Sequence, residues 1–382
     1  MTRRVAIVGV GYTTPRPVTP DVSYRELIYD AAVRAYDDAG ISPKDVDAFT
    51  TCAEDLTEGT SIFDEYTPDQ LGAVQKPVHT ITGDGIHGLL AAWMQVRTGL
   101  LDVVVLEAHS KASNLLTKDH VLHYAMDPVY NRPLGYSPQA IAGMEMQRWL
   151  HESGTTPEEC AHVVVKNRAN ALSNPNGAHA AQLTVEDVLR SEKTFDPLTH
   201  LQTAPFSDGS VVLVLASEER ARRMKGQPIW VAGGGWCNDT PWIENREWGR
   251  AVYAEKSAKM AYKQAGVKNP AREIDVFEID DSYAFKELQH MEALDLCRPG
   301  EAGRLARLGE TDRGSEMPVN VSGGSLGMGS LLDAAGAYRV VEVALQLRGE
   351  AGRRQVEGAR RGLAMAWRGV PSASGAVVVL EN

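Results

Sequence analysis

The sequence predicts an α/β protein built from two similar halves, and three observations support this fold class. First, the chain repeats itself, because "AYDDAGISPKDVDAF" (35–49) recurs as "AYKQAGVKNPAREIDVF" (261–277). Second, the two halves end alike, in "SDGSVVLVLAS" (207–217) and "SASGAVVVLEN" (372–382). Third, apolar strands such as "VVVL" alternate with helices in each half. This alternation is typical of mixed, largely parallel sheets covered on both faces, and two such sheets that share buried helices would form one globule.

In the first half, a helix begins near Tyr24 and ends at the glycine of "AYDDAG", before a strand that ends in "VDAF" (46–49). Further strands are expected at "KPVHTI" (76–81) and in "LDVVVLEAHS" (101–110). Between these two strands, "TGDGIHGLLAAWMQV" (82–96) reads as a tight glycine turn followed by an amphipathic helix. A strand, a sharp turn and a helix is the geometry that exposes a nucleophile at a helix N-terminus. This turn, however, offers glycine, aspartate and histidine and contains no cysteine or serine.

The second half repeats this order from Arg250 through "GGSLGMGSLLDAAGAYRVVEVALQLR" (323–348). Within the first half, the segment 111–204 interrupts the alternation of strands and helices and is expected to be a loop-rich insertion, with "MDPVYNRPLGYSP" (126–138) as its turn region. Long insertions of this kind often carry substrate contacts. We therefore predict an N-terminal half at 1–110 and 205–245, a pocket-shaping insertion at 111–204, and a C-terminal half at 246–382.

Composition restricts the class of protein. With 382 residues and 43% hydrophobic content, the chain can form one large core or two fused cores. Its four cysteines show no CxxC spacing, so neither disulfides nor a zinc site is expected; they are Cys52, Cys160, Cys237 and Cys297. No secretory segment is recognised at the N-terminus, and no apolar run approaches the roughly 20 residues of a membrane span. A soluble, cytoplasmic protein that does not enter membranes is expected.

The net charge of −11 provides no basic stripe for nucleic acid, so no nucleic-acid partner is expected. The densest basic stretches, "RARRMK" (220–225) and "GRRQVEGARR" (352–361), are typical of solvated helix faces. The second stretch could also contact a phosphate-bearing cofactor.

Several long blocks, in the correct order, resemble the thiolase superfamily, specifically the sterol-carrier-protein-like and lipid-transfer-protein-like thiolases. "VNVSGGSLGMGSLLDAAGAY" (319–338) resembles the family's Asn-Pro-Ser-Gly-Gly block followed by Gly-His-Pro-x-Gly-Ala-x-Gly. "EIDDSYAFKELQHMEALDLCRPGEAG" (278–303) is similar to the stretch that normally contains His-Asp-Cys-Phe, and two further blocks match at 164–191 and 195–217. The resemblance implies a thiolase fold, five-layered αβαβα from two pseudo-symmetric halves, together with a homodimer and a coenzyme A thioester substrate.

The same resemblance indicates that the family's polar catalytic positions have changed. The acyl-accepting cysteine falls on Gly85 and the catalytic histidine on Ser330. The second cysteine falls within "WRGVPSASG" (367–375), which contains none, and the Asn or His of the oxyanion hole falls on Asp280. Without a thiolate, no acyl-enzyme of the usual kind can form. An ionised carboxylate at 280 would repel an oxyanion, so Asp280 is expected to be a protonated acid or to have another task.

One subgroup of the superfamily, the steroid side-chain retro-aldolases, cleaves a β-hydroxyacyl-CoA without a cysteine. That reaction requires a base for the β-hydroxyl proton and donors for the thioester oxygen as an enolate forms. The candidate side chains are His87, Asp280, Asp281, Tyr283 and Ser330. The candidate backbone donors are Gly85 at the elbow and the stretch Ser322, Gly323 and Gly324.

Each candidate also has a structural interpretation. His87, which Asp84 could orient, is either a base at the start of a helix or a histidine packed against a neighbouring helix. Tyr283 is either a general acid or a buried tyrosine bonded to backbone. Asp280 and Asp281 could share a proton, although successive strand residues point to opposite faces, so only one of them can face the pocket. Retro-aldolases of this subgroup use tyrosine where this chain has Ser330.

We therefore predict a retro-aldol lyase in a hetero-oligomer, inactivated by His87→Ala. One alternative is a non-catalytic thiolase-like subunit that supports an active acyltransferase. A further alternative is an acetyl-CoA C-acyltransferase with non-canonical residues. The expected partners are the acyl-CoA substrate and either a second thiolase-like chain or a small zinc-ribbon and OB-fold protein. Coenzyme A enters as part of the substrate, no side chain is assigned to bind it, and no metal is expected.

Overall fold

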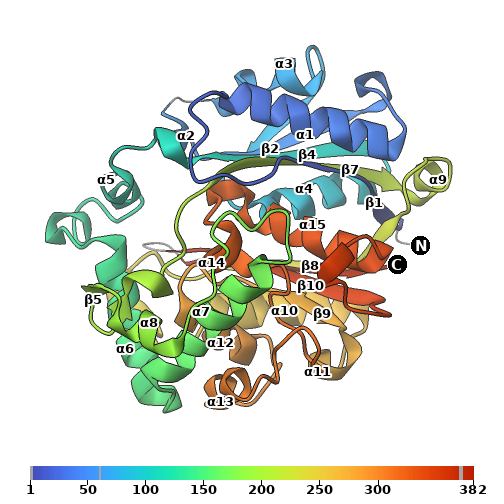
Figure 1. The fold of residues 1–382 in the computed structure, drawn as a ribbon. Helices are drawn as coiled ribbons and strands as arrows, with labels where there is room; N and C mark the ends of the chain where they lie inside the picture. Colours follow the sequence, from blue (N-terminus) through green and yellow to red (C-terminus); the bar gives the residue numbers. More distant parts are fainter. Residues whose placement is uncertain (1–2, 60–61, 370–372) are drawn as a thin grey trace.

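The computed structural model describes residues 3–59, 62–369 and 373–382 (Figure 1). A nine-stranded mixed sheet runs through the molecule in the order β3-β2-β4-β7-β1-β8-β11-β10-β9. Its strands are β1 (Val5–Tyr12), β2 (Ala48–Cys52), β3 (Val78–Ile81), β4 (Val103–Lys111), β7 (Asp208–Ser217), β8 (Ile229–Asn238), β9 (Val276–Glu278), β10 (Arg361–Arg368) and β11 (Ser374–Glu381). A separate hairpin is formed by β5 (Lys193–Phe195) and β6 (Leu198–Thr199).

Strand order confirms that the two halves are pseudo-symmetric. The order β2-β4-β7-β1 in the first half corresponds to β9-β10-β11-β8 in the second. In each half the first of these pairs is parallel and the next two are antiparallel. The halves join where β1 pairs with β8 through only two residue pairs, Ala6 with Trp230 and Ile7 with Ile229. The repeat seen in the sequence is therefore a repeat of topology.

The helices complete the layers. They are α1 (Tyr24–Ala39), α2 (Asp55–Glu58), α3 (Pro68–Leu71), α4 (Gly85–Arg97), α5 (Lys118–His123), α6 (Pro138–Ser153), α7 (Pro157–Ala171), α8 (Val185–Arg190), α9 (Glu218–Ala221), α10 (Val252–Ala265), α11 (Pro270–Glu273), α12 (Ala284–Ala293), α13 (Ala302–Arg307), α14 (Gly324–Met328) and α15 (Ala335–Arg348). Helices α4 and α15 contact each other and strands of both halves, whereas α1 and α10 cover the outer faces (Figure 1). The layers thus alternate helix, sheet, helix, sheet, helix, as predicted. No helix within the described ranges is long and apolar enough to cross a membrane.

The repeated helices have local sequence causes. A capping box between Ser23 and Glu26 starts α1, and Gly40 in the left-handed region (φ 69°) ends it. Its counterpart α10 ends at Gly266 in the same conformation (φ 69°). Helix α4 lies very close to the first-half strands, because a Cβ at Gly88 would lie 2.1 Å from Cys52 Sγ. Only glycine allows that approach.

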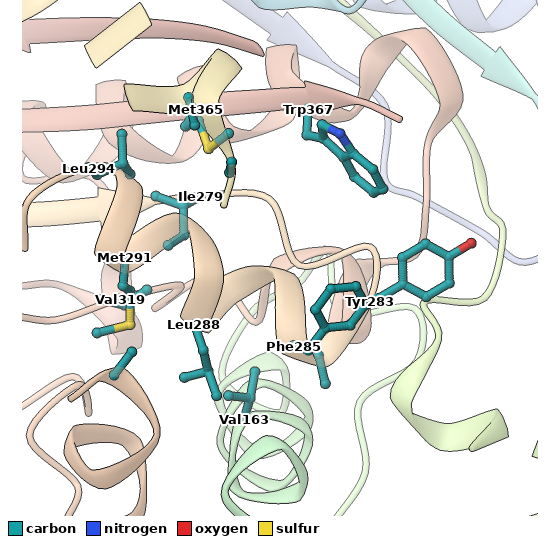
Figure 2. Packing of buried hydrophobic residues seen from close by; sticks show 14 of the residues in the cluster. Val163, Ile279, Tyr283, Phe285, Leu288, Met291, Leu294, Val319, Met365 and Trp367 are labelled. Carbon is teal, nitrogen blue, oxygen red and sulfur yellow. The ribbon is translucent and has the colours of Figure 1, made fainter. Parts of the chain in front are cut away.

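The segment 111–204 is more helical than expected. Besides loops and the small hairpin, it contains α6 with 16 residues and α7 with 15 residues. Ser137 caps α6, and a capping box between Thr156 and Glu159 starts α7. Val163 of α7 packs in one hydrophobic cluster with Phe285 and Leu288 of α12 (Figure 2). These helices are therefore attached to the second half, while 1–110 with 205–245, 111–204 and 246–382 remains our proposed division of the chain.

Candidate active site

A cavity of about 160 Å³ lies where the elbow before α4, the insertion and the loops of the second half meet. Its apolar wall comes mainly from the insertion and the segment after it: Leu122, Ala125, Pro138, Ala204 and Phe206. Its ionisable wall combines both halves: Glu54, Asp84, Asp280, Tyr283, Asp333 and Arg368. An apolar pocket with a few convergent polar groups is the usual form of a small-molecule site.

The adjacent acids Asp280 and Asp281 point in different directions. Asp280 lines the cavity and accepts hydrogen bonds from the amide and hydroxyl of Ser282 at 3.0 and 3.2 Å. Asp281 does not line it; its carboxylate accepts the amide of Ser325 at 2.6 Å and that of Leu326 at 3.1 Å. Burial raises the pKa of Asp281 to about 7. Asp281 thus holds the start of α14, and only Asp280 is placed to meet a substrate.

The side chain of Arg339, which was not predicted from the sequence, is in direct contact with the Asp280 carboxylate. Its guanidinium is 1% exposed and lies 2.7 Å from Asp280 Oδ2 and 3.9 Å from Asp281 Oδ1. It also donates to Ser325 Oγ at 2.7 Å. Asp280 is therefore one half of a buried ion pair. An arginine in the mostly apolar stretch "AGAYRVVEVAL", whose one other charged residue is Glu342, was the available signal.

The elbow itself is closed to a side chain at Gly85. A Cβ there would lie 2.6 Å from Ala337 Cβ and 2.9 Å from Ala337 N, because α15 packs directly on the start of α4. The preceding residue, Asp84, caps α4 and lines the cavity. Its carboxylate accepts the amides of Ile86 at 2.9 Å and Gly336 at 2.8 Å. Burial raises the pKa of Asp84 to about 6.

The structure does not bring His87 into the cavity. It sits in the first turn of α4 but is not among the lining residues. Neither ring nitrogen makes a well-formed hydrogen bond to a described residue. Burial lowers the pKa of His87 to about 4, with a smaller contribution from Arg368. His87 is therefore a neutral, packed imidazole.

Tyr283 and Ser330 do line the cavity. The centroid of the Tyr283 ring lies 6.2 Å from the ring centroid of Phe285 and 6.2 Å from that of Trp367. The Tyr283 hydroxyl points away from the other side chains of the hydrophobic cluster (Figure 2). The backbone of Ser330 is fixed by its amide, which donates to Pro205 O at 2.6 Å.

The predicted backbone donors of the second half are already engaged. The Ser322 amide donates to Glu278 at 3.0 Å, the Gly323 amide to Asn320 O at 3.0 Å, and the Gly324 amide to Ser322 Oγ at 3.1 Å. None of these three residues, nor Gly85, lines the cavity. This stretch stabilises the loop around α14 and offers no free donor to a thioester oxygen here.

Three further ionisable residues of the cavity were also missed: Glu54, Asp333 and Arg368. Asp333 accepts the Glu54 amide at 3.0 Å, and Arg368 forms an ion pair with the Glu54 side chain. Burial, reinforced by the nearby Glu54 charge, raises the pKa of Asp333 well above its ordinary value. Asp333 lies three residues after Ser330, and Arg368 is the second residue of the stretch 367–375 on which the family's second cysteine falls. Residues 370–372 of that stretch lie outside the described residues.

None of the four cysteines, all of which are described, lines the cavity. Cys52 comes nearest to the elbow, with Sγ 3.8 Å from Asp84 O, but it is buried and burial raises its pKa well above the ordinary value. Such a thiol is a poor nucleophile. Within the described ranges, no group of three or more His, Cys, Asp or Glu side chains is placed to hold a metal ion.

Known proteins similar to this chain agree with this architecture. Residues 236–382 match the family model "Thiolase C-terminal domain-like". An acetyl-CoA acetyltransferase of Methanothermobacter thermautotrophicus is 31% identical over 369 residues, which cover 94% of this chain and 95% of that protein. Sterol carrier protein 2 of Gallus gallus is 31% identical over 383 residues, covering 95% of this chain and 69% of the relative.

Solved structures show the same likeness. An Ltp2-ChsH2(DUF35) aldolase superposes with a TM-score of 0.84 at 25% identity, covering 99% of this chain and 97% of that one. Human mitochondrial 3-ketoacyl-CoA thiolase superposes with a TM-score of 0.76 at 16% identity, covering 100% and 99%, and supports the fold alone. Together with the duplicated topology, these similarities show that the chain belongs to the thiolase superfamily.

Proposed function

We propose that this protein cleaves or forms a carbon–carbon bond at the β-position of an acyl-CoA thioester, by retro-aldol chemistry without an acyl-enzyme. The observation that carries the proposal is the elbow: Gly85 has no room for a side chain, and no cysteine lines the cavity. Ionisable groups with raised pKa values face the cavity instead. Such groups are the usual means of acid–base catalysis.

The chemistry needs one base and one acid. A base removes the proton of the β-hydroxyl, the Cα–Cβ bond breaks, and its electron pair moves onto the thioester as an enolate. A proton returned to Cα then gives a shortened acyl-CoA and a carbonyl compound, so atoms and charge balance. Asp84, with a pKa of about 6, is ionised near neutral pH yet more basic than an ordinary aspartate, which suits the base. Asp333, whose pKa is raised further, suits the acid that hydrogen-bonds the enolate oxygen.

Tyr283 and Ser330 supply hydroxyl groups at the same cavity, and we assign them to hold the β-oxygen and the thioester oxygen. His87, the Asp281 carboxylate and the amides of 322–324 are left out of the reaction, because each lies outside the cavity. The cavity volume of about 160 Å³ is smaller than the roughly 300 Å³ at which drug-sized sites begin. It therefore suits the reacting end of the thioester, with the nucleotide of coenzyme A held outside.

We further propose a protein partner on the insertion. Large apolar side chains of 116–136 are strongly exposed, among them Leu116 (95%), Val129 (68%) and Tyr130 (65%). Leu122 and Ala125 of the same segment line the cavity. An exposed apolar surface of this kind marks an interaction site, and a partner seated there would close the cavity. The similar Ltp2-ChsH2(DUF35) aldolase is itself a complex of two proteins.

A non-catalytic subunit is the second candidate, because the amides of 322–324 and the Asp280 carboxylate are all engaged internally. The deciding experiment supplies a 3-hydroxy-3-methylacyl-CoA to the purified chain, alone and with a DUF35-type partner, and quantifies the ketone and acyl-CoA released. We expect turnover and no acyl adduct on the intact protein by mass spectrometry. A stable adduct on one of the four cysteines, with turnover lost in the matching Cys→Ala variant, would overturn the proposal; silence in both conditions would favour the subunit.

A further inference from the structure

A second depression, of about 620 Å³, lies at the opposite end of α4 from the active-site cavity. Helix α4 runs over 13 residues from Gly85, beside the cavity, to Arg97, which lines this depression. At 1.5 Å per residue the two ends are about 18 Å apart, with the packed core between them. The depression is thus separate from the proposed reaction.

The lining of this depression is strongly cationic and aromatic. Four arginines and two tryptophans face it: Arg3, Arg4, Arg97, Arg361, Trp93 and Trp230. Glu381 is the single carboxylate among the lining residues. In a chain whose net charge is −11, this concentration of positive charge stands out.

Two of the arginines have free hydrogen-bonding edges. The Arg4 guanidinium stacks over the Trp230 ring at 4.1 Å, and the Arg97 guanidinium over the Trp93 ring at 4.4 Å. Stacking fixes the guanidinium planes without using their N–H donors. Within the described part of the chain, Arg97 makes no hydrogen bond or ion pair, and Arg4 reaches only Glu381, at 3.7 Å.

The other two arginines are held in place by acids. Arg3 pairs with Asp102, and Arg361 pairs with Glu381 at 3.1 Å. Glu381 therefore pairs with two arginines, Arg4 and Arg361. Because one carboxylate cannot neutralise both, the lining of the depression keeps an excess of positive charge. Arg361 is the last residue of "GRRQVEGARR", the stretch that the sequence singled out for a possible phosphate contact. The stretch is not a uniform solvated face, because Arg354 is buried against Glu342 at 2.8 Å.

We propose that this depression binds a nucleoside polyphosphate. The edges of Arg4 and Arg97 would receive the phosphates, since guanidinium groups match phosphate oxygens in geometry and charge. The flat guanidinium–indole stacks would receive the base. The volume falls within the range of small-molecule sites. The proposal goes beyond the lyase function and does not depend on it.

Isothermal titration of the full chain with ATP, adenosine and inorganic tripolyphosphate tests this proposal. We expect ATP to bind at least tenfold more tightly than tripolyphosphate, and adenosine not to bind. Arg4→Gln with Arg97→Gln should weaken ATP binding at least tenfold. The matched control is Arg190→Gln on α8, an exposed arginine paired only with Glu186, and it should change affinity less than twofold.

Circular dichroism and thermal melting show whether the double variant folds, and the salt dependence of the unmodified protein is a second measurement. ATP affinity should fall steeply as KCl rises from 50 to 300 mM, because phosphate–arginine contacts are screened. Equal binding of ATP and tripolyphosphate, an unchanged affinity in the folded double variant, or no ATP binding at all would each overturn the proposal. If the unmodified protein binds ATP but does not cleave a 3-hydroxyacyl-CoA, that result counts against the proposed function and not against the nucleotide site.

Discussion

Asp84 and Asp333 occupy corresponding places in the two halves, beside the starts of the paired inner helices α4 and α15. Each accepts a backbone amide from the opposite half, Asp84 from Gly336 at 2.8 Å and Asp333 from Glu54 at 3.0 Å. Each also lines the same cavity. The duplication has therefore placed two buried carboxyl groups in the wall of one cavity at the junction of the halves.

Their surroundings differ in charge and in the number of donors. Asp84 accepts a second amide, from Ile86, and benefits from the Arg339 charge, so burial raises its pKa only to about 6. Asp333 faces the Glu54 charge, which adds to burial and raises its pKa further, although Arg368 opposes this effect. The difference teaches that one duplicated position can give two carboxyl groups with different electrostatic surroundings, which is why we propose one as the base and the other as the acid.

Replacing Asp333, the proposed acid, should reduce activity more than any other change to this pair. Asp333→Asn keeps an oxygen that can accept the Glu54 amide but cannot donate a proton to an enolate. We expect kcat/KM for a 3-hydroxyacyl-CoA to fall by about 10³-fold, as for removal of a general acid. The matched control, Asp37→Asn on the exposed face of α1, should leave activity unchanged. Asp333→Asn retaining more than a tenth of the activity would exclude Asp333 as the acid.

Replacing the base should cost less and change the pH profile. Asp84→Asn is expected to lower kcat by about 10²-fold, because general-base catalysis commonly contributes 10²–10⁴-fold. In the unmodified protein, kcat should rise with pH through about 6 as Asp84 ionises, and fall at higher pH as Asp333 loses its proton. The acid limb should vanish in Asp84→Asn. An unaltered limb near pH 6 in that variant would assign it to another group.

Sequence reasoning anticipated the duplication and the order of the repeated helices and strands, because helix stops such as Gly40 and Gly266 and the apolar strands are local signals. The expectation of largely parallel sheets was wrong, because only three of the eight neighbouring strand pairs of the nine-stranded sheet are parallel and the long strands in its middle pair antiparallel. It also placed Asp280, Tyr283 and Ser330, all of which line the cavity. It did not identify Asp333, Arg339 and Arg368 as residues in or beside the cavity. Their positions depend on how α15 and the end of β10 pack against the elbow of the other half. Hydrogen bonds between halves, such as Gly336 to Asp84, leave no mark on a single stretch of sequence.

The amides of 322–324 are engaged by groups of their own half. Glu278 of β9 accepts the Ser322 amide, whereas the Gly323 and Gly324 amides bond locally, to Asn320 O and Ser322 Oγ. The segment 111–204 was expected to be loop-rich, with 126–138 as its proline-marked turn region, whereas Pro138 occupies the first turn of α6, and Pro157 that of α7. Proline marks a helix start as readily as a turn.

Introducing a cysteine at Gly85 tests how tightly α15 packs against the elbow of the first half. Gly85→Cys introduces a Cβ 2.6 Å from Ala337 Cβ, so α15 must shift away from α4. We expect the free energy of unfolding to fall by about 1–3 kcal/mol, as in other overpacked cores. Gly314→Cys is the matched control, since nothing lies within 4 Å of a Cβ there, and it should be neutral. Denaturant unfolding measures both; a Gly85→Cys variant as stable as the control would show that the elbow can accept a side chain.

His87→Ala is expected to have the smallest effect on activity, less than about fivefold in kcat, because a general base must lie within hydrogen-bond reach of its proton and His87 lies outside the cavity. Its effect should appear in the pH dependence of stability instead. The folded pKa of about 4 lies below the ordinary 6.5, so the unfolded chain binds more protons between these values and the histidine destabilises the fold as pH falls below 6.5. His87→Ala should remove that part of the slope, measured as the free energy of unfolding from pH 4.5 to 7. A loss of kcat above 100-fold with an unchanged slope would return His87 to the reaction, and would mean that the cavity rearranges to admit it.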